Sequence, residues 1–176
     1  MFSFFSILHS APAPIPRYKQ VDTFNNIIPH IYIGNVDSLK TPGSFELIVN
    51  CTKHIGIVPG KKTIRIAVND HPTESRVLLD SIKDNRVLEQ IHYYVLLKRN
   101  VLVHCHAGMQ RSCAIVAMYL MKYHGITPVE AIRFIPTKRS VAFYPEPTFR
   151  QAMHDFYTFL HSERQPEGLA SMNVIR

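Results

Sequence analysis

The sequence predicts an α/β layered domain, in which helices cover a central sheet. Two observations support this fold class: short apolar runs typical of buried strands, and longer segments in which apolar residues recur at helical spacing. The chain has 176 residues, of which 46% are hydrophobic, enough for one sizeable core and short for two. We therefore expect one domain at residues 25–162, an apolar and then proline-rich extension at 1–24, and a polar tail at 163–176.

Four short runs are expected to form strands. Residues 31–33 are a β-prone run that ends at the turn signal Gly34-Asn35. Residues 47–49 and 101–103 are apolar throughout, as expected for buried strands, and residues 63–68 alternate between apolar and polar.

The segments that follow carry helical patterns. Residues 77–97 predict one long amphipathic helix or two joined ones, and residues 112–123 are apolar nearly all round, as in a buried central helix that stops at Gly125. The next helix opens with a capping box made by Thr127, Pro128 and Glu130. Residues 148–160 predict a last amphipathic helix.

The first eight residues, Met1 to Leu8, are apolar and superficially resemble a secretion signal, but they lack its basic start. We expect them to pack on a second copy of the chain and form a homodimer; packing on their own domain is the alternative. No apolar run approaches the ~20 residues of a transmembrane helix, so no membrane-spanning segment is expected.

The formal net charge is +7, which predicts an anionic partner. Nucleic acid is not favoured, because the chain has no zinc-ligand spacing, zipper heptads or aromatic-basic RNA-binding signature. The three cysteines, Cys51, Cys105 and Cys113, form no disulfide framework and suit a reducing compartment. We therefore expect a cytoplasmic protein.

Residues 104–112 read H-C-H-A-G-M-Q-R-S and lie between a predicted buried strand and a predicted buried helix. A short loop that enters a helix N-terminus turns several backbone N–H groups toward one point, and the helix dipole adds positive potential there. Gly108 permits the curvature that a ring around a phosphate needs. The loop is therefore predicted to bind phosphate through His106, Ala107, Gly108, Met109, Gln110 and Arg111.

Cys105 is expected to attack phosphorus as a thiolate from the floor of this loop. The planar fork of Arg111 can hold two phosphate oxygens at once, which a lysine cannot do. Ser112 is expected to hydrogen-bond the sulfur, and His104 to support the loop from behind. A bare Cys-x5-Arg would equally fit a buried cysteine beside a surface arginine, but the flanking residues and the strand-loop-helix setting favour catalysis. Cys113 is expected in the core.

The reaction also needs a carboxylic acid that protonates the leaving oxygen. Asp70 is the best candidate because it follows a predicted strand, precedes a predicted helix and stands in a turn with Pro72. The alternative for Asp70 is a turn-forming or helix-capping residue. Weaker candidates for the acid are Glu74, Asp80 and Asp84.

The loop H-C-H-A-G-M-Q-R-S resembles the phosphate-binding signature of protein tyrosine phosphatases, specifically their compact dual-specificity, poxvirus-type branch. The resemblance covers residues 25–162, and its further matches are at 31–35, 47–52, 66–70, 119–121, 125–131 and 145–149. It implies a five-stranded, mostly parallel sheet flanked by helices, and a two-step hydrolysis of phosphotyrosine, phosphoserine or phosphothreonine in proteins without metal or cofactor. Apolar extensions occur in virus-encoded members, whose place would be the host cytoplasm or the virion.

The sequence departs from that pattern at Glu146, where the loop that braces the phosphate site usually has asparagine. Phosphoinositide phosphatases tend to carry lysines in the signature loop, and RNA 5′-triphosphatases a different loop, so both substrate classes are alternatives rather than the first expectation. A phosphate-binding scaffold is a third alternative. In some relatives a cysteine near Cys51 forms a reversible disulfide with the nucleophile, and a small buried apolar role is the alternative for this residue.

Overall fold

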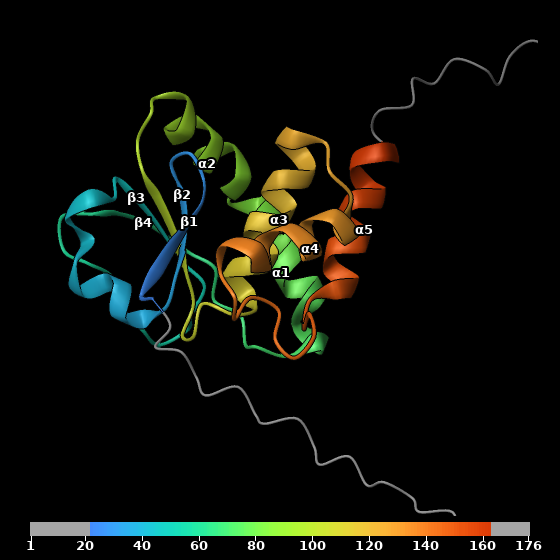
Figure 1. Ribbon diagram of the computed structural model, residues 1–176, viewed down its shortest axis with the longest axis horizontal. Helices are drawn as coiled ribbons and strands as arrows, with labels where there is room; N and C mark the ends of the chain where they lie inside the picture. The colour runs from blue at the N-terminus through green and yellow to red at the C-terminus, as the bar shows by residue number, and fades with distance from the viewer. Residues whose placement is uncertain (1–21, 163–176) are drawn as a thin grey trace, which may run out of the picture.

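A five-stranded sheet runs through the part of the chain that the computed structural model describes, residues 22–162 (Figure 1). The strands lie in the order β1-β2-β5-β3-β4, and β1 is antiparallel to β2 while all other neighbours are parallel. Their bounds are Phe24–Ile28 (β1), Ile31–Gly34 (β2), Leu47–Asn50 (β3), Lys62–Arg65 (β4) and Val101–His104 (β5). The expected mostly parallel five-stranded sheet is confirmed.

In the described part of the chain five α-helices flank the sheet, and Figure 1 shows α1, α3, α4 and α5 gathered on one side of it. Their bounds are Ser75–Asp84 (α1), Val87–Leu96 (α2), Arg111–His124 (α3), Pro128–Lys138 (α4) and Arg150–Ser162 (α5). Ten residues of α3 in a row, 112–121, are buried. This confirms the buried central helix that the apolar run predicts, and Gly125 ends it in the left-handed conformation.

The period-two pattern of the strands divides the apolar residues between two cores. Val101 and Val103 of β5 join the large core under the helices, whereas Leu102 packs with Phe45 and Ile48 on the opposite face. Leu39, from the short 3-10 helix η1 (Val36–Lys40), helps to cover that second face. A second 3-10 turn, η2 (Pro42–Ser44), follows it.

Three elements differ in detail from the expectations. The 77–97 pattern forms two helices, because Arg86 takes a left-handed conformation with φ of 47° between them. Within 63–68 only the first residues pair with β3, as part of β4, and the chain then leaves the sheet toward a 3-10 turn, η3 (Pro72–Glu74). Strand β1 was not expected, because its central Asn25-Asn26 interrupts the apolar pattern; pairing with β2 creates it.

The predicted extension and tail fall almost wholly outside residues 22–162, so the domain limits stay predictions. The homodimer expected through Met1 to Leu8 likewise concerns residues outside the part that the structure describes. Within that part, no helix is both long and apolar enough to cross a membrane.

Candidate active site

The loop that joins β5 to α3 lies at the carboxyl end of the central part of the sheet. Strand β5 pairs with β2 on one side and with β3 on the other, so the loop has neighbours from both. On the β3 side, the backbone N–H of Cys51 donates to the carbonyl of His104 over 2.8 Å. Ligand sites of parallel sheets form at this edge, where the strands end and helix N-termini begin.

Four consecutive carbonyls of the loop accept hydrogen bonds from residues outside it. The backbone N–H of Val36 donates to the carbonyl of His106 (3.0 Å), and that of Phe143 donates to the carbonyl of Met109 (2.8 Å). Between them, the guanidinium of Arg139 donates to the carbonyls of Ala107 (3.2 Å) and Gly108 (2.7 Å). In a trans peptide the C=O and the N–H point in opposite directions. Because the carbonyls face outward, the N–H groups of residues 107–110 face the concave side of the loop. This arrangement is an anion-binding nest.

Arg139 is a functional residue that the sequence reasoning missed. It is 1% exposed, and besides the two loop carbonyls its guanidinium donates to the carbonyl of Asp22 (3.0 Å) and to Oδ1 of Asn25 (2.6 Å). It therefore ties the loop to the start of β1. An arginine after the last turn of a predicted helix is usually taken as a favourable C-terminal charge, so no local signal distinguishes it.

Only glycine fits at position 108, because of the backbone conformation there and because of two atoms close to its Cα. Its φ is +65°, and a Cβ atom built there would lie 2.6 Å from both Nη2 of Arg139 and the carbonyl oxygen of Gly34. The curvature that the sequence assigns to Gly108 is therefore needed both for the backbone turn and for the close approach of β2.

Cys105 lies at the floor of the nest and is 1% exposed. Its Sγ atom accepts a hydrogen bond from the N–H of Gly108 at 3.2 Å and lies 3.3 Å from Oγ of Ser112. Both groups can donate to a sulfur that carries negative charge during the reaction. Ser112 thus stands where the sequence expects it.

Arg111 begins α3, and its guanidinium turns toward the ends of two neighbouring segments. Its Nη1 donates to the carbonyls of Cys51 and Val68, each over 3.1 Å. Its Nε is buried, has no hydrogen-bond partner within residues 22–162 and lies 3.8 Å from Oδ2 of Asp70. A phosphate oxygen would supply the partner that this Nε lacks.

Asp70 lies on the segment between β4 and η3, beside Arg111, and its side chain is 35% exposed. Burial raises the pKa of the Asp70 carboxyl above its usual value, while the positive charge of Arg111 and the side chain of Thr148 act against this rise. A carboxyl group with a raised pKa holds its proton to higher pH, as a general acid must. Of the weaker candidates, Glu74 accepts hydrogen bonds from Asn69 and so holds the same turn.

His104 is fully buried behind the loop, and burial lowers its pKa to about 4, with the charges of Arg65 and Arg111 acting in the same direction. The ring is therefore neutral near pH 7. The backbone of Cys105 is near enough to oppose part of this lowering, but neither ring nitrogen makes a hydrogen bond of standard geometry within residues 22–162. The expected support of the loop is thus mainly packing.

The other two cysteines are buried and free. Burial raises the pKa of the Cys51 thiol well above its usual value, and the neighbouring Cys105 adds to that rise. Burial likewise raises the pKa of the Cys113 thiol, whose Sγ lies 3.6 Å from the carbonyl of Gly108. Both thiols therefore stay protonated, and Cys113 lies in the core as expected.

At the bracing loop, Glu146 meets the phosphate loop through its backbone. Its carbonyl accepts a hydrogen bond from Nε2 of Gln110 over 2.9 Å, and the residue is exposed. The Glu146 side chain, which stands where asparagine is usual, is thus not what joins the bracing loop to the phosphate loop.

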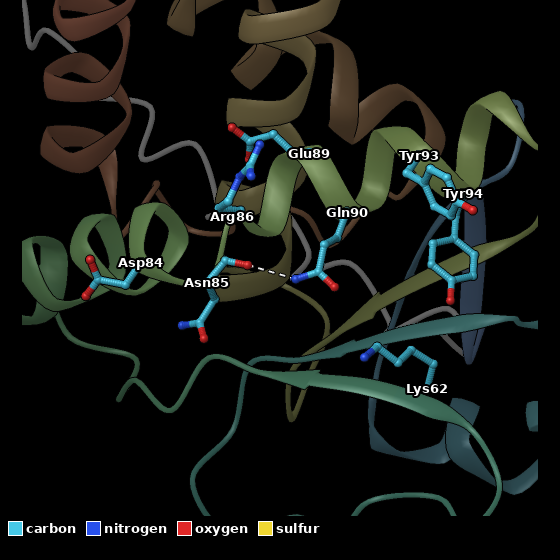
Figure 2. A pocket seen from close by; sticks show the side chains of 8 residues that line it. All are labelled: Lys62, Asp84, Asn85, Arg86, Glu89, Gln90, Tyr93 and Tyr94. Carbon is cyan, nitrogen blue, oxygen red and sulfur yellow. Dashed lines mark hydrogen bonds between the residues drawn. The ribbon is translucent and has the colours of Figure 1, made fainter.

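A hollow of about 460 Å³ lies elsewhere, between β4 and α2 (Figure 2). Its lining carries charges of both signs, and Lys62 of β4 faces Gln90 and Tyr94 of α2 across it. No residue of the 104–112 loop lines this hollow, so it is separate from the candidate active site. Among residues 22–162, no three His, Cys, Asp or Glu side chains are arranged to hold a metal ion.

Comparison with known proteins agrees with this geometry. The chain is 30% identical over 138 residues to a candidate tyrosine phosphatase, 123R, of Invertebrate iridescent virus 6, an alignment that covers 77% of this chain and 93% of the viral protein. It is 31% identical over 138 residues to dual specificity protein phosphatase 15 of Mus musculus, covering 74% of this chain and 56% of that protein. The chain thus spans about half the length of this mouse relative.

Among solved structures, human DUSP28 superposes with a TM-score of 0.70 at 22% sequence identity, covering 85% of this chain and 99% of that one. This likeness supports the fold. The fold and the loop together define a cysteine-dependent protein phosphatase. The catalytic-domain model of the dual specificity phosphatases matches residues 31–159, and the chain belongs to that family. The expected family is thereby confirmed, and one of its relatives is viral.

Proposed function

We propose that this chain hydrolyses phosphotyrosine and phosphoserine or phosphothreonine in proteins, with Cys105 as nucleophile, Arg111 as phosphate ligand and Asp70 as general acid and base. One observation carries the proposal: the loop carbonyls are bonded outward, so the N–H groups of residues 107–110 face the concave side of the loop, where Gly108 already donates to Sγ of Cys105. The Nε of Arg111, which is buried and has no partner within residues 22–162, supports its proposed role as phosphate ligand. An ionised phosphate monoester is the ligand that such a ring of donors fits.

The first step forms a bond between Sγ of Cys105 and phosphorus while the bond to the leaving oxygen breaks. The protonated carboxyl of Asp70 gives its proton to that oxygen, so the alcohol or phenol leaves neutral. In the second step water attacks phosphorus and loses a proton to Asp70. The sulfur then leaves as a thiolate, and Ser112 at 3.3 Å stabilises its charge.

The test is a substrate panel: para-nitrophenyl phosphate, phosphopeptides, a phosphoinositide and a triphosphorylated RNA. We expect turnover of para-nitrophenyl phosphate and phosphopeptides, none with Cys105→Ser, and with Asp70→Asn a loss of ~10²–10⁴ on phosphoserine, whose leaving group needs a proton. Greater turnover of the lipid or the RNA would refute a protein substrate. Full activity of Cys105→Ser in the cellular task would favour the scaffold.

Three further parts of the proposal concern the surroundings of the site. Cys51 and Cys105 each directly follow one of two adjacent parallel strands, and Cys51 is proposed to protect Cys105 by a reversible disulfide. A peroxide would oxidise the Cys105 sulfur to a sulfenic acid, and the Cys51 thiol would then condense with it and release water. A thiolate enzyme with free cysteines works in a reducing compartment, so we place it in the cytoplasm. The homodimer through Met1 to Leu8 stays a prediction, to be tested by sedimentation of the full chain against residues 17–176.

A further inference from the structure

Gln110 is the last loop residue before α3, and its side chain does not cap the helix. Serine, threonine, aspartate and asparagine are the usual N-cap residues, because their short side chains reach back to the helix N–H groups. The Gln110 side chain is instead buried and turns toward the segment between α4 and α5.

The amide of Gln110 makes three hydrogen bonds there. Its Nε2 donates to the carbonyls of Tyr144 and Glu146, each over 2.9 Å, and its Oε1 accepts from the N–H of Thr148 at 3.0 Å. A glutamine amide has two N–H donors and one acceptor oxygen. Both donors and the acceptor are thus bonded to the backbone of one short segment, residues 144–148, which this chain keeps in place without the usual asparagine.

The same segment reaches the candidate general acid. The side chain of Thr148 lies near the Asp70 carboxyl and lowers its pKa, and Asp70 in turn lies 3.8 Å from Nε of Arg111. Gln110 adjoins Arg111 in sequence. The Gln110 side chain therefore links the loop proposed to bind phosphate to Thr148, the residue that neighbours the candidate acid.

We propose that Gln110 is a positioning residue: it holds Thr148 against Asp70 and so keeps the general acid in register with the phosphate loop. The inference rests on the proposed roles of Cys105 and Asp70. Its chemistry is specific for glutamine. Asparagine is one methylene shorter and does not span the same gap, and glutamate would set a carboxylate against two carbonyl oxygens.

The test compares the native protein with the variant Gln110→Met. This substitution keeps the length and apolar volume of the side chain but removes its three hydrogen bonds. We expect kcat/KM for phenyl phosphate to fall ~10-fold or more, and kcat/KM for para-nitrophenyl phosphate to fall less than 3-fold, because this ratio reports the first step, in which only the poorer leaving group needs the acid. KM and inhibition by orthovanadate should stay within about 2-fold, because the phosphate ring itself is unchanged. Gln151→Met, on the exposed face of α5, is the matched control and should change neither rate.

A second variant keeps the proposal testable should Gln110→Met fold poorly. Thr148→Val removes only the hydroxyl and leaves the backbone bond to Gln110 in place; it should show the same selective loss on phenyl phosphate. In the double variant the two losses should not add, because both act on the same acid. Equal losses on the two substrates, weakened vanadate inhibition or additive effects would overturn the positioning role.

The outcome is separable from that of the proposed function. If Asp70→Asn, in an otherwise unchanged protein, lowers the rates on phenyl phosphate and para-nitrophenyl phosphate equally, the general acid is wrongly assigned and the error lies in the proposed function. If Asp70→Asn distinguishes them and neither Gln110→Met nor Thr148→Val does, only the positioning role is refuted.

Discussion

Replacing Arg139 by methionine tests how the phosphate loop keeps its shape. The guanidinium makes four hydrogen bonds, two of them to the carbonyls of Ala107 and Gly108. Water can reach the exposed Ala107 once the arginine is gone, but Gly108 is buried, and its carbonyl would lose its strong donor and keep only the weak thiol donor of Cys113 at 3.6 Å. A buried group left without its bond costs about 1–3 kcal/mol.

We expect the free energy of unfolding to fall by about 2–4 kcal/mol in Arg139→Met. The lost bonds to Asp22, Asn25 and Ala107 add to the Gly108 cost, and relief from burying a charge offsets part of it. The peptide before Gly108 also loses its orientation toward Sγ of Cys105. Removal of one such donor typically costs ~10²–10³ in rate, so kcat/KM should fall ~10²-fold.

Urea unfolding measures the stability, and para-nitrophenyl phosphate turnover measures the rate. Arg133→Met, exposed on α4, is the matched control and should change both by little. Arg139→Lys keeps the positive charge but lacks the planar guanidinium. Its stability and its kcat/KM should lie between those of Arg139→Met and those of the native protein. A folded Arg139→Met protein with native kcat/KM would show that the loop keeps its shape without this arginine.

Three further predictions concern single residues. Gly108→Ala should lower the free energy of unfolding by about 1–3 kcal/mol and remove most activity, because φ is +65° and a Cβ would clash. The control Gly60→Ala also has a positive φ but has open surroundings. It should lower the stability to urea by less and leave the rate of phosphate hydrolysis unchanged. As pH falls from 6.5 toward 4, the unfolded chain binds a proton at His104 that the folded chain refuses, so stability should drop by ~3 kcal/mol. A folded His104→Gln protein with an unchanged pH slope of stability would contradict that assignment. Mild peroxide should yield a 51–105 disulfide by mass spectrometry; its absence, with Cys105 oxidised further instead, would discard the protective role of Cys51.

Several parts of the fold could be predicted because their signals are local. The runs at 47–49 and 101–103 are apolar enough to require burial, and residues 112–123 are apolar on every face, so a strand and a helix follow from hydrophobicity alone. The capping box at Thr127 forms as its spacing predicts, since its partners are three residues apart.

The loop at 104–112 is contiguous in sequence, so the sequence alone determined that a cysteine, a glycine and an arginine would share one helix N-terminus. Tertiary structure decided the remainder. Arg139 is 31 residues from Gly108, and Gln110 meets Tyr144 across 34 positions. Such partners are chosen by packing rather than by spacing along the chain, because a hydrogen bond across the fold depends on where whole elements come to rest. For the same reason β1 could not be predicted from the sequence, because its polar residues form a strand only by pairing with β2.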